Sequence, residues 1–167
     1  SNEVLAQGGV EKVGLAGAFL KLTLPSGEKV QLDKDIPEHQ TAIEFILSTL
    51  TSAEYGAIKD VSEISAVGHR VVHGGEIFDK SVLINEDVIS KIDDCASLAP
   101  LHNPAGIIGI EACKKVMPGK PMVGVFDTTF HQTMPKEKFM YPIPYEYYKK
   151  YGIRKYGAHG TSHMYVA

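Results

Sequence analysis

The sequence predicts an α/β fold, and three observations support this. Residues 19–24 and 29–32 alternate apolar and polar side chains around the turn-forming residues 25–28, which is typical of a hairpin. Residues 122–126 form a short, continuous apolar run, which is typical of a strand buried on both faces. Helical spacing occurs between these strands, and such alternation indicates layers of sheet and helix.

The segments between the predicted strands carry helix signals. A helical stretch opens at Pro37. Residues 64–72 read as a strand that ends in His73-Gly74-Gly75, and a further helix begins near Asn85 and stops before residue 100. The apolar face of the first helix consists of Ile43, Ile46, Leu47 and Leu50.

The second half of the chain adds one more helix and an irregular tail. Asn103 and Pro104 are a predicted N-cap and N1 pair for a helix that ends at residues 118–119. Residues 140–156 are rich in Tyr and Pro, so we expect a loop with a short helix there.

Composition excludes several function classes. The chain has 167 residues and a net charge of -3, which argues against a nucleic-acid-binding protein. It has no apolar run near the roughly 18 residues of a membrane span and no secretory signal pattern, so we expect a cytoplasmic protein. Cys95 and Cys113 are expected to be buried or half-buried free thiols. Residues 1–2 could be a cloning scar.

Arginine is rare in this chain and therefore informative. There are 15 lysines but only two arginines, Arg70 and Arg154. Arg70 lies inside an apolar strand just before Gly74-Gly75, and paired glycines allow a backbone to approach a ligand closely. This pattern suits a phosphate or carboxylate site. The alternative is a structural arginine at a sheet edge or paired with a buried carboxylate.

Asp127 ends the predicted buried strand. In open α/β sheets, ligands bind outside the carboxyl ends of the strands, so Asp127 is a candidate site residue. Its alternative role is to cap the following turn.

The histidines offer a weak case for metal and a better one for an anion. His69 and His73 would stand about 13 Å apart on a strand, too far to share one ion. His159 and His163 have helical metal-ligand spacing, but Gly160 and the following hydroxyl residues favour a helix start. We therefore expect no zinc site. A histidine there, with free N–H groups, could bind an anion, or the hydroxyl residues could simply cap the helix.

The sequence carries no GxxxxGK[ST], GxGxxG or GxSxG motif. Four other segments are distinctive: residues 67–75 (VGHRVVHGG), 98–104 (LAPLHNP), 125–135 (VFDTTFHQTMP) and 156–163 (YGAHGTSH). Together these segments resemble the acetate kinase family in content, order and spacing, and the likeness runs from about residue 3 to the end.

The resemblance implies a ribonuclease H-like domain with a mixed sheet and flanking helices, in the superfamily of acetate and sugar kinases, heat-shock-cognate ATPases and actin. Residues 3–167 would be an incomplete N-terminal domain of a two-domain kinase, without its first strand, its phosphate segment and its nucleotide domain. The implied reaction converts acetate and ATP, with Mg2+, to acetyl phosphate and ADP. The implied enzyme is a homodimer, and this part alone should be inactive.

The resemblance also implies residue roles. Arg70 would bind acetate or the transferring phosphoryl group, Asp127 is the family's active-site aspartate, and His159 would stabilise the transition state. Val72 and Leu101 would line the pocket for the acetate methyl. His102 would face the phosphate or support the site. No residue of the chain is assigned to nucleotide or metal.

Acetate is already ionised near pH 7, so it needs no proton-abstracting base. We therefore expect Asp127 to orient Mg2+ or Arg70.

Two departures from the family pattern are Ala158, where some members have Phe, and Thr129, where Ala is common. Ala158 keeps propionate or butyrate open as the substrate. A non-enzymatic ligand-binding module on the same scaffold is the remaining alternative, and the joint presence of Arg70, Asp127 and His159 argues against it.

Overall fold

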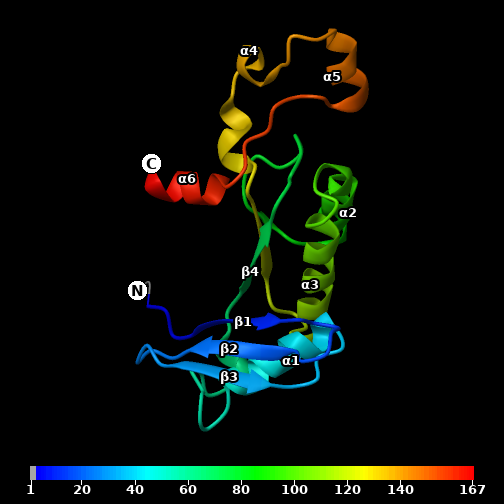
Figure 1. The fold of residues 1–167 in the computed structure, drawn as a ribbon. Coiled ribbons are helices and arrows are strands. Elements are labelled where there is room, and N and C mark those ends of the chain that lie inside the picture. Colours follow the sequence, from blue (N-terminus) through cyan, green and yellow to red (C-terminus); the bar gives the residue numbers. More distant parts are fainter. Residues whose placement is uncertain (1–2) are drawn as a thin grey trace. The chain divides into compact units, whose positions relative to one another are not determined.

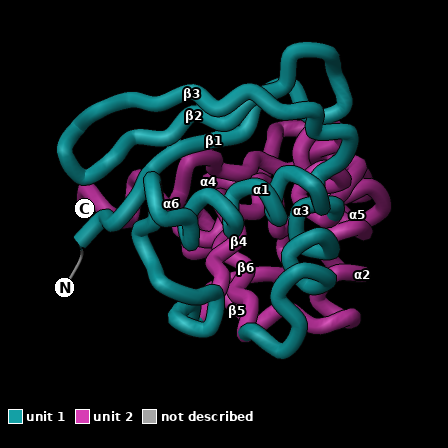
Figure 2. Tube along the Cα trace, turned by 90° about the horizontal axis from the view of Figure 1, so that it is seen from below, with its two compact units in different colours: residues 1–65, 108–120 teal, residues 66–107, 121–167 magenta. Residues whose placement is uncertain are grey.

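The computed structural model describes residues 3–167, which divide into two compact units (Figures 1 and 2). Of the described residues, unit 1 comprises 3–65 and 108–120, and unit 2 comprises 66–107 and 121–167. Helix α3 (Asn103–Val116) contributes to both units. The expectation of a cloning scar concerns residues outside the described part.

Unit 1 contains a three-stranded antiparallel sheet in the order β1-β2-β3. Strands β2 (Phe19–Thr23) and β3 (Lys29–Asp33) are the predicted hairpin, confirmed to within one residue at each end. Strand β1 (Gln7–Glu11) pairs with β2 and was not predicted, because Gly8 and Gly9 interrupt any alternation of apolar residues.

Helix α1 (His39–Leu50) belongs to the same unit and begins two residues after Pro37, as predicted. No residue of its predicted apolar face is exposed, and Leu47 is buried. A small core joins the sheet to this helix; it consists of Ala18, Ile36 and Ala42, surrounded by Val10, Val13 and Phe45. The hydrophobic effect of closing this face stabilises unit 1.

Unit 2 is built on a three-stranded mixed sheet in the order β4-β6-β5. Strand β4 (Val67–Val71) is parallel to β6 (Met122–Phe126), and β5 (Val82–Leu83) is antiparallel to β6. The predicted α/β class with a mixed sheet is confirmed. Strand β4 is shorter than predicted: it begins three residues later, at Val67, and ends one residue earlier, at Val71. A capped turn of 3-10 helix, η1 (Val61–Glu63), comes before it in the chain.

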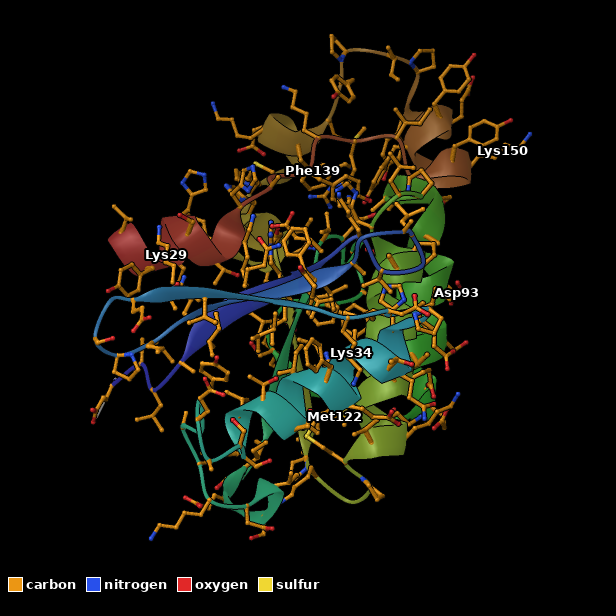
Figure 3. All side chains as sticks on the ribbon, turned by 60° about the horizontal axis from the view of Figure 1, so that its bottom comes forward. Lys29, Lys34, Asp93, Met122, Phe139 and Lys150 are labelled. Atoms are coloured by element: carbon orange, nitrogen blue, oxygen red, sulfur yellow. The ribbon has the colours of Figure 1, made fainter. Side chains whose placement is uncertain are left out.

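Strand β6 corrects one prediction. Its residues alternate between buried and half-buried, so the strand is fully buried on one face only. Met122 (labelled in Figure 3), Gly124 and Phe126 are on the buried face. Val123 and Val125 are half-buried on the other, which is the face that carries polar groups of the candidate site.

The remaining helices of unit 2 follow the predicted order. Helix α2 (Glu86–Asp94) begins after Asn85, whose side chain accepts a hydrogen bond from the Val88 N–H at 2.9 Å. A short 3-10 helix, η2 (Ala96–Leu98), leads towards α3, and η3 (Thr129–Thr133) follows β6.

Cys95 and Cys113 are buried free thiols, as expected. No helix within residues 3–167 is long and apolar enough to cross a bilayer.

Residues 134–157 form a segment that we call the arm. It contains α4 (Lys136–Phe139) and α5 (Tyr145–Tyr151) joined by loops, which confirms the expected mixture of loop and short helix. After the arm, the chain ends in α6 (Gly160–Val166), which contacts β6 and η3 (Figure 1).

Candidate functional site

The register of β4 and β6 places Arg70 and Asp127 on one face of the sheet. Arg70 is opposite Val125, and Val71 is opposite Phe126. The Asp127 N–H continues the ladder by donating to the Val71 carbonyl at 2.9 Å. Because side chains alternate along a strand, Asp127 shares the face of Arg70, one diagonal step away. Two residues that are 57 positions apart in sequence thus meet.

The Arg70 guanidinium forms a two-pronged contact with the Asp127 carboxylate. Its Nε donates to both carboxylate oxygens at 3.0 and 3.1 Å, and its Nη2 donates to Oδ2 at 2.6 Å. The Asp127 side chain is 3% exposed, whereas the Arg70 side chain is 64% exposed. Hydrogen bonding to Asp127 and its negative charge raise the pKa of Arg70. The alternative stated for Arg70, that it pairs with a buried carboxylate, therefore describes the contact that the structure has.

This pairing leaves donors available. Within the described residues, Nη1 of Arg70 donates to no protein acceptor. A guanidinium held rigidly on one side and open to solvent on the other suits a planar carboxylate or a phosphoryl group.

The backbone of Asp127 also holds the start of α6. Its carbonyl accepts a hydrogen bond from the Gly160 N–H at 2.7 Å. Glycine is required by this close approach, because a Cβ at position 160 would lie 2.3 Å from the Asp127 carbonyl oxygen. This contact corrects one expectation: the first N–H after His159 is not free to bind an anion. The helix has only seven residues, and His159 makes no side-chain cap.

His159 has a strained backbone. Its φ of 54° lies in the left-handed region, which non-glycine residues rarely adopt. Its side chain is exposed. Such a conformation costs about 1–3 kcal/mol and is often found at functional sites. It places the imidazole at the point where the chain turns from the arm into α6.

The Gly74-Gly75 loop is held by residues that follow β6. The Gly74 N–H donates to Oγ1 of Thr128 at 3.0 Å, and Nε2 of Gln132 donates to the Gly75 carbonyl. Gly75 has a positive φ of 58°, and a Cβ there would lie 2.9 Å from Sγ of Cys95. Sequence reasoning missed Thr128 and Gln132, since a hydroxyl and an amide after a strand carry no distinctive signal.

Asn103 has a different role from the predicted N-cap. Helix α3 begins at Asn103 itself, and the side chain is 1% exposed. Its amide donates to the carbonyls of His73 and Ile92 at 2.9 and 3.1 Å, and its oxygen accepts from the His73 N–H at 3.2 Å. The residue therefore fixes the loop that follows β4.

The other predicted site residues occupy the surrounding surface. Val72 is half-buried, one residue after β4 and level with Asp127. Leu101 is 84% exposed, and His102 is exposed at the start of α3. Their contacts with a substrate remain predictions. An open cavity of about 290 Å³ lies beside the end of β6, lined in part by Val125, Thr129 and Gly160.

A bound metal ion needs several ligand atoms that converge on one point. Within residues 3–167, no group of three or more His, Cys, Asp or Glu side chains is placed to hold a metal ion. Asp127 already directs both oxygens at Arg70. These residues alone do not make a magnesium site.

The fold of this chain is similar to the folds of two solved kinases. The Porphyromonas gingivalis acetate kinase crystal structure is 60% identical, with a TM-score of 0.95 over 98% of this chain and 41% of that one. A propionate kinase from Francisella tularensis is 43% identical, with a TM-score of 0.88 over the same shares.

Sequence comparison leads to the family itself. The profile of the acetokinase family matches residues 1–167. Acetate kinases from Phocaeicola vulgatus and Parabacteroides distasonis are each 64% identical over the whole chain. The chain belongs to the acetokinase family. It spans 42% of the length of these relatives.

Proposed function

We propose that the protein containing this chain is an acetate kinase, which reversibly transfers a phosphoryl group in line from ATP to acetate. One observation carries the proposal. Arg70 is fixed against the buried Asp127 while its Nη1 remains open to solvent. Phosphoryl transfer depends mainly on positioning and on stabilising charge, and a fixed guanidinium supplies both.

In this proposal Arg70 binds the acetate carboxylate or the transferring phosphoryl group. Asp127 orients Arg70 and does not take a proton, which is supported by the contacts of both its oxygens with the guanidinium. Acetate is already ionised near neutral pH and has no proton to give. His159 stabilises the charge that spreads over the phosphoryl oxygens, and its strained backbone supports this role.

The acyl pocket is proposed to include Val72 and Leu101, with His102 facing the phosphoryl group. Val72 is level with Asp127 on the sheet face that carries Arg70, which supports contact with a small acid bound there. Leu101 and His102 are exposed and therefore accessible to a ligand.

The remaining parts of the proposal come from the family. We propose that the complete protein uses ATP and Mg2+, forms a homodimer and is located in the cytoplasm. No residue of this chain is assigned to the metal, and this chain alone is expected to be inactive because it spans only 42% of its relatives.

Propionate or butyrate is the second candidate substrate. Ala158 directly precedes His159, and a small side chain there would leave room for a longer acyl chain. A propionate kinase is among the structures that this chain resembles, at 43% identity.

The test is acyl-phosphate formation by the full-length protein, trapped with hydroxylamine. Acetate, propionate and butyrate are supplied in parallel with ATP and Mg2+. Preference for acetate that is lost in Arg70→Ala supports the proposal, and Lys115→Ala, at an exposed position of α3, is the matched control. Preference for propionate or butyrate selects the second candidate. No product from any of the three acids would contradict both and favour the binding-module alternative.

A further inference from the structure

The second arginine of the chain, Arg154, is enclosed within unit 2. Its side chain is 4% exposed, and its Nη1 pairs with Oε1 of Glu76. The guanidinium carbon lies 3.8 Å from the ring centroid of Phe139 (labelled in Figure 3) and 4.8 Å from that of Tyr156. The same Glu76 oxygen accepts a hydrogen bond from the Tyr148 hydroxyl at 2.9 Å. An acid and two aromatic rings thus surround the cation.

This environment explains why arginine is present in a lysine-rich segment. A buried charge is costly unless it is paired, and a planar guanidinium can pair with a carboxylate while it stacks on rings. Lysines of the arm also contact rings, but from exposed positions: Lys149 lies 5.0 Å from the Tyr145 ring and Lys150 lies 5.0 Å from the Tyr151 ring. Arg154 is different because it is buried.

The Arg154 contacts join the arm to the loop after β4. Glu76 directly follows Gly74-Gly75, so its ion pair fixes the far end of that loop. The ring of Tyr156 packs edge-on against the ring of His73, with centroids 4.6 Å apart. The returning part of the arm is therefore attached to both ends of residues 73–76.

Each of the two joined segments is close in sequence to a residue that contacts Asp127. Residue 73 comes three positions after Arg70, which contacts the Asp127 carboxylate. Residue 156 comes three positions before His159 and four before Gly160, whose N–H binds the Asp127 carbonyl. A shift of the arm against the loop would move Arg70 and His159 relative to each other.

We propose that Glu76 and Arg154 form a latch that sets the spacing between Arg70 and His159, and that both are positioning residues for the reaction. The proposal rests on the proposed function, because it assigns the latch an effect on that chemistry. Neither residue needs to touch the substrate. A purely structural role, keeping the arm folded, is the alternative.

The test uses the full-length protein with Arg154→Met, Arg154→Lys, Glu76→Gln and the double variant Glu76→Gln/Arg154→Met. Lys150→Met and Glu146→Gln, at exposed positions of α5, are matched controls. We expect Arg154→Met and Glu76→Gln to lower kcat for acyl-phosphate formation about tenfold or more at temperatures well below their Tm. Arg154→Lys should recover part of the loss. The double variant should be about as impaired as the worse single variant, because both remove one latch. The controls should stay within about twofold of the wild type.

The outcomes separate the two proposals. If Arg154→Met and Glu76→Gln lower Tm but leave kcat and KM unchanged, the latch is only structural and the inference is wrong. If the wild type forms no acyl phosphate, the proposed function fails, and amide hydrogen exchange then decides the latch. In that case Arg154→Met should speed exchange at Gly74, Gly75 and Gly160 and leave Leu20 and Leu22 of β2 unchanged. Unchanged exchange at the three glycines would overturn the latch.

Discussion

The two arginine sites of unit 2 have opposite patterns of burial. At the Arg70 site the carboxylate of Asp127 is buried and the cation reaches solvent. At the Arg154 site the cation is buried and the Glu76 carboxylate is 40% exposed. An ion pair by itself therefore does not mark a binding site. Whether the pair can bind a ligand depends on whether one of its two side chains keeps hydrogen-bond donors exposed to solvent.

Arg70→Ala should give the largest effect. The full-length variant is expected to lose about 10³-fold in kcat for acyl-phosphate formation, the scale seen when an arginine that stabilises phosphoryl transfer is removed. The hydroxylamine assay measures this directly. A smaller loss than that of Arg154→Met would reverse the comparison, because the buried arginine would then matter more to chemistry than the exposed one.

Glu76→Ala should give the largest loss of stability. It leaves the buried Arg154 without its carboxylate, which we expect to lower the free energy of unfolding by about 3 kcal/mol. Asp127→Ala leaves Arg70 in solvent and should cost about half as much. Urea denaturation of this chain compares the two, and Glu146→Ala on the surface of α5 should cost less than about 0.5 kcal/mol. A greater cost for Asp127→Ala would show that burial of the cation is not decisive.

Gly160→Ala tests the backbone link between Asp127 and α6. The added Cβ would lie 2.3 Å from the Asp127 carbonyl oxygen, so the hydrogen bond from the Gly160 N–H to that oxygen must lengthen. Overpacking of this kind costs about 2 kcal/mol, and thermal unfolding should show it. The control is Gly106→Ala in α3, where a Cβ meets nothing within 4 Å and should stabilise the helix slightly. Equal effects of the two changes would count against a tight contact at Gly160.

Lowering the pH should give the smallest effect, through the loop that connects the two arginine sites. Burial lowers the pKa of His73 and of His69 below their ordinary value of 6.5. Below about pH 6.5 the unfolded chain therefore binds protons that the folded chain does not, so stability is full above this pH and falls as the pH drops. Protonation of His73 would also remove Nδ1 as the acceptor of the Gly75 N–H, a bond of 3.0 Å.

The measurement is the free energy of unfolding from about pH 7.5 to pH 5. His73→Asn should flatten the decline, whereas His39→Gln, at an exposed histidine, should leave it unchanged. If the free energy of unfolding of His73→Asn falls with pH as steeply as that of the wild type, His73 does not contribute to the decline.

Much of the fold was predictable because its signals are local. The hairpin of β2 and β3 follows from side-chain alternation and a turn, and α2 follows from the cap at Asn85. Strand β5 was missed because it has only two residues and exists through its pairing with β6. The apolar run of β6 suggested burial on both faces, yet run length alone does not reveal which face a sheet leaves open.

The candidate site was only partly predictable. Arg70, Asp127 and His159 were singled out from composition and position, and the fold brings the first two into contact. No sequence pattern states that Asp127 also accepts from Gly160, since that depends on the path of the arm. Arginine is equally scarce at Arg154, but no sequence pattern singled this residue out, because its partner Glu76 is 78 positions away. Such distant pairings cannot be derived from local spacing.

These long separations have a consequence for the order of events during synthesis. Strand β4 leaves the ribosome before its partner β6, and Glu76 precedes Arg154 by 78 residues. At a synthesis rate of about 5–20 residues per second, Arg154 is added roughly 4–16 s after Glu76. The Arg70–Asp127 contact spans 57 residues and can close first. The newly made chain can therefore pair Arg70 with Asp127 before the arm has been completed.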